Sequence, residues 1–290
     1  MKTCLLIPAA GKGKRFLRKK YKTYKPFLKI IKKEMIQYIF DNFPKSMEKI
    51  IIVDKNIKKK YTTILKKKNI KILKINPHNK GPAFSIHAAQ KKLNLKQGFF
   101  VSYSDILWNW DFSKIKRLTN KNIIFTYKGF HPYTIYDNKY AFCRANVNND
   151  LIDIKEKSPY TKDWSNENLS IGCFYFKNGY EMVDAISKMI EKKQTANNEY
   201  FPSLAFNYLN KKNKDTIVEE VKSFFHLGKP EYYEDFKNWL SFFRNKNSFF
   251  KKNNKLSDFL IMPCAGKGSR FPKKDYSLPK PFIKINNKSM

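Results

Sequence analysis

The sequence predicts an α/β fold of the Rossmann-like kind, in which helices flank a mostly parallel sheet. Two observations carry this prediction. Short apolar runs alternate with segments of helical spacing over the first half of the chain, and such alternation is typical of βαβ units. Glycine-containing loops follow two of the apolar runs, at Gly11 and Gly81. Because ligands bind at the carboxyl edge of open parallel sheets, we expect these loops to meet at one binding edge.

Each element of the first half follows from its own pattern. Residues 3–9 are a short apolar run that ends at a glycine-rich loop, as a buried parallel strand does. Pro82 suits the first turn of a helix, where its missing N–H costs nothing. We predict strands at 3–9, 49–54, 70–75, 98–104 and 122–128, and helices at 34–43, 57–68 and 83–94.

The pattern changes at about residue 130, where strand-like pieces become separated by polar loops. This change predicts an α+β insertion that covers the edge of the sheet. Its expected strands are 132–136, 139–145, 151–156, 169–177 and pieces near 216–227, and its expected helices are 178–193, 199–210 and 230–243.

The opening of the chain is repeated at its end. Residues 1–35 and 256–290 align without a gap and are identical at 17 of 35 positions. A strand repeated for packing alone would keep mainly its hydrophobic pattern, whereas here the Gly, Lys, Arg and Pro residues of the loop are kept as well. We therefore expect a first domain at 1–243, a linker at 244–257 and the truncated start of a second domain of the same kind at 258–290.

Composition limits the class of protein. With 42% hydrophobic residues among 290, the chain can build a sizeable core. It has no run of about 18 apolar residues, so we expect no membrane span. The four cysteines form no CxxC pair and no metal spacing, which favours reduced thiols and a cytoplasmic location.

The net charge of +35 comes almost entirely from lysine, since only six of the 59 basic residues are Arg. Proteins that read nucleic acid favour Arg for bidentate contacts. We therefore expect no specific nucleic-acid partner, but a solvated surface that steers anionic substrates. Whether the chain forms a homo-oligomer stays open.

The loop after the first strand has the composition of a phosphate site. In Ala10-Gly11-Lys12-Gly13 the glycines allow close backbone approach, and successive N–H groups can cradle phosphate oxygens. The loop is neither a P-loop nor the dinucleotide fingerprint, because GxxxxGK[ST] and a third glycine are both absent. A plain basic turn is the alternative. Arg15, Lys25 and the repetition of the whole set favour the phosphate site.

These residues resemble the opening signature of the sugar-phosphate nucleotidylyltransferases, the NTP-transferase family of nucleotide-sugar pyrophosphorylases. The resemblance covers about residues 3–240, with motifs in the family's order. They are Gly81-Pro82-Ala83, similar to its base-contacting turn; Ser104-Asp105, similar to its metal-binding aspartate; Glu156-Lys157, similar to its sugar-phosphate motif; Ser170–Phe176, similar to its glycine strand beside the sugar; and Leu227–Glu231, similar to its closing LGTPE segment with Lys229 in place of Thr.

The resemblance implies transfer of NMP from an NTP to a sugar 1-phosphate, with release of pyrophosphate. It also implies a sugar-binding role for the insertion and a Mg²⁺ cofactor. Glu199 is the candidate second metal ligand, although Asn197-Asn198-Glu199-Tyr200 departs from the family's EITD-like segment. The implied roles are catalysis by Arg15 and Lys25; nucleotide binding by Ala10, Gly11, Lys12, Gly13, Gly81, Pro82 and Ala83; sugar-phosphate binding by Glu156, Lys157 and Gly172; and metal binding by Asp105 and Glu199.

Two other classes of function stay open. A glycosyltransferase of similar sheet architecture would require a DxD motif after the fourth strand, where Ser104-Asp105-Ile106 offers one carboxylate. A non-catalytic nucleotide-binding module would not need Arg15, Lys25, Asp105 and Glu156 together. The sequence names neither base nor sugar, and a phosphorylated alcohol such as phosphocholine is also conceivable as the acceptor.

The repeat generates a first prediction. Deleting residues 257–290 should leave kcat and KM for both substrates within about twofold, because changes away from structural features shift free energies by about 0.5 kcal/mol or less. Steady-state kinetics of the shortened chain measure this. A large loss of activity in a folded variant would show that Lys267, Arg270 or Lys280 reaches the first site.

Overall fold

The computed structural model describes residues 2–19, 21–129, 140–209 and 215–244, and the backbone of two short strands, β14 (Lys284–Ile285) and β15 (Lys288–Ser289). The chain divides into two units, Met1–Phe243 and Arg244–Met290. In the second unit β14 pairs with β15 in antiparallel fashion. Most of the repeat at 258–290 and the expected strand at 132–136 lie outside the described residues, so both stay predictions.

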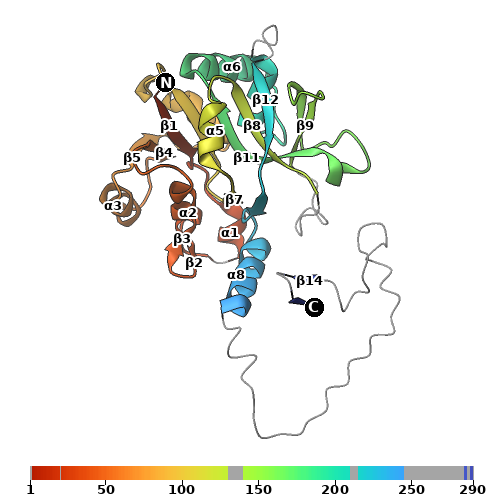
Figure 1. The fold of residues 1–290 in the computed structure, drawn as a ribbon. Coiled ribbons are helices and arrows are strands. Elements are labelled where there is room, and N and C mark those ends of the chain that lie inside the picture. The colour runs from red at the N-terminus through yellow and green to blue at the C-terminus, as the bar shows by residue number, and fades with distance from the viewer. Residues whose placement is uncertain are drawn as a thin grey trace, which may run out of the picture. The chain divides into compact units, whose positions relative to one another are not determined.

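Four of the five strands predicted for the first half of the chain run parallel and lie side by side. β1 (Thr3–Pro8) lies between β4 (Glu48–Asp54) and β6 (Gly98–Ser102), and β5 (Lys71–Ile75) is the outer neighbour of β4. β1 is buried on both faces, which explains its continuous apolar run. The sheet with its flanking helices confirms the predicted α/β class (Figure 1).

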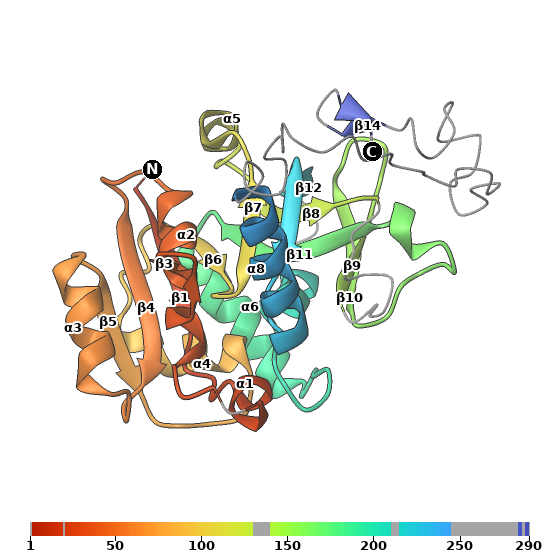
Figure 2. The same cartoon turned by 90° about the horizontal axis from the view of Figure 1, so that it is seen from below.

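The insertion extends this sheet with strands of mixed direction. β11 (Asn168–Phe176) pairs antiparallel with β6. The fifth predicted strand of the first half, β8 (Asn122–Tyr127), is therefore separated from the parallel strands and pairs antiparallel with β11. β12 (Thr216–Glu220) runs parallel to β8. β9 (Ala141–Ala145) and β10 (Leu151–Glu156) lie at the end of the sheet away from β5 (Figure 2). The strands of the insertion are therefore continuous with the main sheet.

Alternation along the strands separates two hydrophobic layers. Leu6 and Ile52 face one layer, whereas Leu5 and Ile51 face the other. Helices from distant parts of the chain complete both layers. The first layer contains residues of α4 (Pro82–Ala89), α6 (Gly179–Glu191) and α7 (Pro202–Ala205), and the second contains residues of α2 (Met35–Asp41), α3 (Lys59–Lys67) and α5 (Phe112–Arg117).

A smaller cluster joins the C-terminal part of the first unit to its N-terminal loop. Phe16 of α1 (Lys14–Arg18) packs with Leu227 and with Tyr233 of α8 (Pro230–Arg244). Four short 3-10 helices connect these elements: η1 (Lys25–Phe27), η2 (Gln90–Lys92), η3 (Trp164–Asn166) and η4 (Phe206–Tyr208). Two further strand pairs lie outside the main sheet. They are β2 (Lys29–Ile30) with β3 (Lys33–Glu34), and β7 (Ile106–Asn109) with β13 (Ser223–His226).

The expected helix at 199–210 is wrong in its form. The structure has only α7 followed by η4, since Pro202 at the first helical position sets the start of α7 at residue 202. Sequence patterns also missed α1 and α5, which have five and six residues. Helices this short do not complete the two turns that make an apolar periodicity visible.

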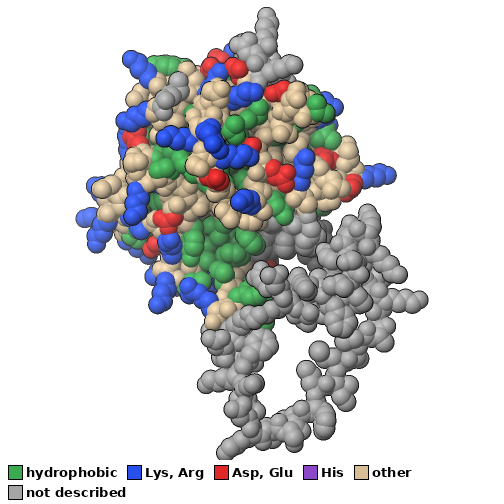
Figure 3. All heavy atoms as spheres, in the orientation of Figure 1, with side chains coloured by type: hydrophobic (Ala, Val, Ile, Leu, Met, Phe, Trp, Pro, Cys, Tyr) green, Lys and Arg blue, Asp and Glu red, His purple; other side chains and the backbone are tan. Residues whose placement is uncertain are grey.

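The described surface agrees with a solvated, lysine-rich protein. Lys and Arg side chains are scattered over the face shown in Figure 3 and do not form a single stripe. Within the described ranges, no helix combines the length and apolar character that crossing a membrane requires. Cys4, Cys143 and Cys173 are buried free thiols.

A glycine at the start of α6 generates a stability prediction. A Cβ at Gly179 would lie 2.6 Å from Phe99 Cε2 and 2.8 Å from the backbone Cα and O of Leu95. Gly179→Ala should therefore lower the free energy of unfolding by about 1–3 kcal/mol, the usual cost of overpacking.

Chemical denaturation measures this loss. Gly11→Ala is the matched control, because no atom lies within 4 Å of its added Cβ. Equal effects of the two substitutions would contradict the packing argument.

Candidate active site

A cavity of about 610 Å³ opens where β1 and β6 end. It brings together loops that are far apart in the sequence, as expected from the carboxyl edge of a parallel sheet. The sequence-predicted residues that line it are Gly11, Lys12, Gly13, Arg15, Lys25, Gly81, Pro82, Asp105, Glu156, Lys157, Gly172 and Glu199.

Two predicted residues do not line the cavity. Ala10 and Ala83 have exposed fractions of 2% and 0% and belong to the hydrophobic core. The backbone N–H of Ala83 donates to the carbonyl oxygen of Tyr200 at 3.0 Å. Ala83 therefore packs the turn in place, and its amide is already used.

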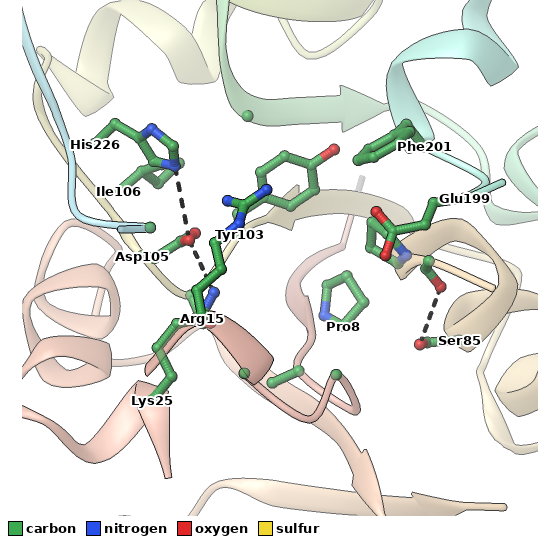
Figure 4. Close-up of a pocket in the computed structure, with 18 of the residues that line it drawn as sticks. Pro8, Arg15, Lys25, Ser85, Tyr103, Asp105, Ile106, Glu199, Phe201 and His226 are labelled. Atoms are coloured by element: carbon green, nitrogen blue, oxygen red, sulfur yellow. Dashed lines mark hydrogen bonds and ion pairs between the residues drawn. The ribbon is translucent and has the colours of Figure 1, made fainter. Parts of the chain in front are cut away.

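The glycine loop leads directly into α1. Gly13 has φ 61°, in the left-handed region that favours glycine, and it precedes the first residue of α1. Gly11, Lys12 and Arg15 are exposed. Figure 4 shows the Arg15 side chain extending toward Tyr103 in the cavity. The loop thus presents two cations and a glycine-containing backbone to the cavity.

An ion pair links this loop region to the end of β6. Lys25 Nζ donates to Asp105 Oδ2 at 2.8 Å, and His226 Nε2 lies 3.8 Å from the same oxygen. Asp105 is 7% exposed. Its burial alone would raise the pKa of the carboxyl, but the Lys25 ammonium and the neighbouring His226 together hold that pKa well below its usual range. Asp105 is therefore an ionised carboxylate at the cavity wall.

The segment that carries Glu199 is tied to the Gly81 turn. Tyr200 N–H donates to the Lys80 carbonyl at 2.8 Å, and a Cβ at Gly81 would lie 2.7 Å from the Tyr200 carbonyl oxygen. Gly81 also has φ 89°. Only glycine suits this close approach, which brings the predicted base-contacting turn and Glu199 to one side of the cavity.

Glu156 has an unusual environment for a carboxylate. Its side chain is half-buried, and Ser203 Oγ donates to its Oε2 at 2.5 Å. Burial raises the pKa of Glu156 to about 7, against the opposing effects of the Ser203 hydrogen bond and Lys157. The Lys157 ammonium lies 4.4 Å from the centre of the Phe201 ring. This end of the cavity therefore combines a carboxyl group, a cation and an aromatic face.

Sequence reasoning missed Tyr103 at the centre of the cavity. Its N–H donates to the Gly172 carbonyl at 3.0 Å, and a Cβ at Gly172 would lie 2.4 Å from Tyr103 Cδ2. Gly172 has φ 84°, a backbone conformation that favours glycine. Its missing Cβ also leaves room for the Tyr103 ring. In Figure 4 Tyr103 lies between Asp105 and Glu199. The sequence signal that could have identified Tyr103 was its position next to Ser104-Asp105, at the end of a predicted strand.

Two cavity histidines were also missed. His226 directly precedes the Leu227–Glu231 motif, which was the available signal. His78 accepts from the Lys80 N–H at 3.1 Å and contacts Ser85 Oγ at 3.0 Å through its other nitrogen. Burial and Lys80 both lower the pKa of His78. His78 therefore braces the Gly81 turn as a neutral ring.

The two predicted metal ligands lie apart. Figure 4 places Asp105 and Glu199 on opposite sides of Tyr103. In the part of the chain that the structure describes, no three His, Cys, Asp or Glu side chains converge on a common metal position. Any ion here would take most of its ligands from bound phosphate and water.

Comparisons with known proteins bear on the family that the motifs resemble. Residues 5–119 match the MobA-like NTP transferase domain. Over 234 residues the chain is 28% identical to the bifunctional protein GlmU of Caldicellulosiruptor saccharolyticus, covering 78% of this chain and 48% of that protein. The chain thus spans about half the length of this relative. The resemblance inferred from the motifs is confirmed, whereas a truncated second copy stays a prediction.

Solved structures establish the fold. A nucleoside-diphosphate-sugar pyrophosphorylase from Vibrio cholerae superposes with a TM-score of 0.68 at 18% identity, covering 81% of this chain and 99% of that one. A UDP-glucose pyrophosphorylase complexed with UDP-glucose has a TM-score of 0.63 at 19% identity, covering 83% and 98%. At such identities the likeness concerns the fold alone.

The raised pKa of Glu156 generates a pH prediction. Between pH about 4.5 and about 7 the carboxyl is protonated in the folded chain and ionised in the unfolded chain. Rising pH therefore lowers wild-type stability in this window. Glu156→Gln cannot titrate, so its stability relative to wild type should rise by roughly 1–3 kcal/mol across the window.

Urea unfolding at several pH values measures the difference. Glu191→Gln, which removes an exposed carboxylate at the end of α6, is the matched control. The explanation fails if both variants respond to pH alike.

Proposed function

We propose that the chain is a nucleotidylyltransferase that moves NMP from an NTP to a sugar 1-phosphate and releases pyrophosphate. One observation carries the proposal. A single cavity is lined by the cationic glycine loop, by the Lys25–Asp105 pair and by the Glu156-Lys157 corner. These groups match the three parts of such a reaction: a triphosphate, a reacting phosphorus and a phosphorylated acceptor.

The glycine loop would hold the triphosphate. Lys12 and Arg15 supply positive charge, and the backbone around Gly11 and Gly13 is open to close approach by phosphate oxygens. Arg15 would bind the β- and γ-phosphates that leave as pyrophosphate. The Gly81-Pro82 turn, braced by His78, would lie along the base.

The chemical step would be an in-line displacement. An oxygen of the sugar phosphate attacks the α-phosphorus, a new P–O bond forms, and the bond to the oxygen that bridges the α- and β-phosphates breaks. This chemistry requires positioning and charge neutralisation more than acid–base groups. Lys25 would neutralise both the attacking and the α-phosphate oxygens, because its ammonium lies at the cavity wall between the loop and Asp105.

The Glu156-Lys157 corner would hold the acceptor. Lys157 would pair with the sugar phosphate, and Glu156 would exchange hydrogen bonds with hydroxyl groups. A carboxyl with a pKa of about 7 can either donate or accept such bonds. Gly172 lets the Tyr103 ring pack against the backbone on this side, since a Cβ there would lie 2.4 Å from Tyr103 Cδ2.

Mg²⁺ is the proposed cofactor, and Asp105 fits it. The carboxylate is ionised, buried and at the cavity wall, and hard oxygen ligands are those that Mg²⁺ prefers. When bound, the ion would neutralise charge on the phosphate oxygens. Asp105 would hold it, and bound phosphate and water would supply most other ligands, since the second candidate from the sequence, Glu199, lies on the opposite side of Tyr103.

Other acceptors and other classes of enzyme remain outcomes of the assay. A matrix of NTPs against sugar 1-phosphates and phosphocholine, with Mg²⁺ or Mn²⁺, reads pyrophosphate release. Release that depends on both substrates supports the proposal. Consumption of an NDP-sugar only with a sugar acceptor would indicate a glycosyltransferase, and nucleotide binding without any turnover would indicate a regulatory module.

Lys25 generates the mutational prediction. Lys25→Ala should lower kcat by roughly 10²–10³, the usual cost of removing one preorganised donor at a reacting oxygen. Asp105→Asn should behave similarly and shift the metal requirement.

Initial rates of pyrophosphate release measure these effects. Lys29→Ala is the matched control, because Lys29 is exposed on β2 and does not line the cavity. Circular dichroism checks folding, since Lys25→Ala leaves Asp105 without its cation. Normal turnover of a folded Lys25→Ala variant would remove Lys25 from the mechanism.

A further inference from the structure

The short helix α1, which carries Arg15, is held to the body of the first unit by one buried side chain. Phe16 is the buried residue of α1, whereas Arg15 beside it is exposed and lines the cavity. α1 has five residues, and a helix this short has little stability without tertiary contacts. The position of Arg15 therefore depends on the groups that pack around Phe16.

The last helix of the unit, α8, supplies an aromatic contact for Phe16 and a hydrogen bond for the segment that follows α1. The Phe16 ring meets Tyr21 and Tyr233 edge to face, with ring centres 5.3 and 6.1 Å away. The Tyr21 hydroxyl donates to Glu234 Oε1, although the two residues lie 213 positions apart. Figure 1 shows α1 beside the start of α8. The start of α8 therefore holds α1 through both packing and a directional bond.

Glu234 accepts this bond as a carboxylate. Lys237 Nζ donates to its other oxygen, Oε2, at 2.9 Å. Burial alone would raise the pKa of Glu234, but the hydrogen bonds from Tyr21 and Lys237 hold that pKa below its usual value. A hydrogen bond to an ionised oxygen is roughly twice as strong as one between neutral groups. The bond from Tyr21 is therefore a strong contact between α8 and the segment after α1.

The chain that leads into α8 is fixed to the cavity wall at Asp105. Leu227 N–H donates to the Asp105 carbonyl oxygen at 2.7 Å. The Gly228 backbone packs so tightly that a Cβ there would lie 2.5 Å from Asp105 Oδ2. Within the first turn of α8, Tyr233 Oη donates to the Lys29 carbonyl oxygen at 2.6 Å. The segment of Asp105 and α1 are therefore joined through the same end of α8.

We propose that the start of α8 sets the position of Arg15 relative to Asp105, and that Tyr21 and Glu234 are the positioning residues of this contact. The inference rests on the proposed function, in which Arg15 holds the leaving phosphates and Asp105 lies beside the reacting phosphorus. An in-line displacement requires both ends of the triphosphate to be fixed, because a small misplacement can cost a large factor in rate. Neither Tyr21 nor Glu234 lines the cavity, so each acts on the substrate through α1.

The test is the binding of inorganic pyrophosphate to the full chain in the presence of Mg²⁺, measured by isothermal titration. Tyr21→Phe keeps the ring contacts with Phe16 and Tyr233 and removes only the hydroxyl that reaches Glu234. It should raise the Kd for pyrophosphate by about three- to tenfold, as coupled residues in contact do. Tyr180→Phe is the matched control, because it removes the hydroxyl of an exposed tyrosine at the start of α6, outside the cavity.

Two results of this titration would overturn the proposal. One is an unchanged Kd in folded Tyr21→Phe, which would show that the hydroxyl does not position the phosphate site. The other is a wild-type chain that does not bind pyrophosphate, since α1 would then hold no phosphate.

A double-mutant cycle separates positioning from a general loss of stability. If Tyr21 acts through Arg15, adding Tyr21→Phe to Arg15→Ala should change the Kd for pyrophosphate by less than about twofold. Additive effects of the two substitutions would contradict positioning through Arg15.

Conservative replacement of Glu234 tests the hydrogen bond itself. Glu234→Ala should match Tyr21→Phe, whereas Glu234→Gln keeps an oxygen acceptor for the hydroxyl and should recover most of the lost affinity. Equal losses in Glu234→Ala and Glu234→Gln would show that the bond from Tyr21 is not the contact that matters.

Failure of this inference differs from failure of the proposed function. Pyrophosphate binding that depends on Tyr21 and Arg15, without pyrophosphate release for any substrate pair, would support the positioning contact and reject the transferase proposal. Pyrophosphate release with an unchanged Kd in Tyr21→Phe would do the reverse. In an active enzyme Tyr21→Phe should raise KM for the NTP by about three- to tenfold and leave KM for the acceptor phosphate unchanged. Equal rises in both KM values would contradict an effect confined to the triphosphate.

Discussion

The contact on which the site depends is the ion pair between Lys25 and Asp105. It joins the segment after the glycine loop to the end of β6 at 2.8 Å, inside the cavity wall. An isolated charge in such a place is strongly unfavourable, so either side chain alone would be a liability. A well-packed apolar pair would serve stability as well as this pair does. We therefore attribute a binding role to the two charges. Their desolvation lowers the stability that the rest of the fold provides.

Three glycines allow the distant segments to approach this pair. Gly81 lets the backbone around Tyr200 pass within contact distance, Gly172 admits the ring of Tyr103, and Gly228 lets its own backbone pass close to Asp105. A Cβ added at any of these three positions would lie within 2.7 Å of a neighbouring atom. Gly81 and Gly172 also have positive φ. Glycine here is needed because the walls of the cavity come from different parts of the chain.

The sequence predicted the features that arise from neighbouring residues. Apolar runs identified the buried parallel strands, and glycine next to charge identified the loops at their ends. It did not predict that β11 would lie between β6 and β8, because the residue pattern of a strand does not identify its neighbour in the sheet. Tyr103 and His226 were missed for a related reason. Their importance arises from contacts with Gly172 and Asp105, which lie about 70 and 120 positions away.

The overall positive charge of the chain does not define the site, although it acts on its ligands. Basic side chains are scattered over the face shown in Figure 3, and the net charge is +35, so the summed field raises the rate of encounter with any anion without selecting among anions. Choice has to come from groups held at fixed positions inside the cavity. There, carboxyl groups at Asp105, Glu156 and Glu199 interrupt the positive wall formed by Lys12, Arg15, Lys25 and Lys157. A ligand that carries phosphate at one end and hydroxyl groups at the other can bind both the cationic groups and the carboxyl groups of the cavity. A uniformly anionic polymer can bind only the cationic groups. The same distinction explains why a lysine-rich surface and a specific small-molecule cavity can occur in one chain.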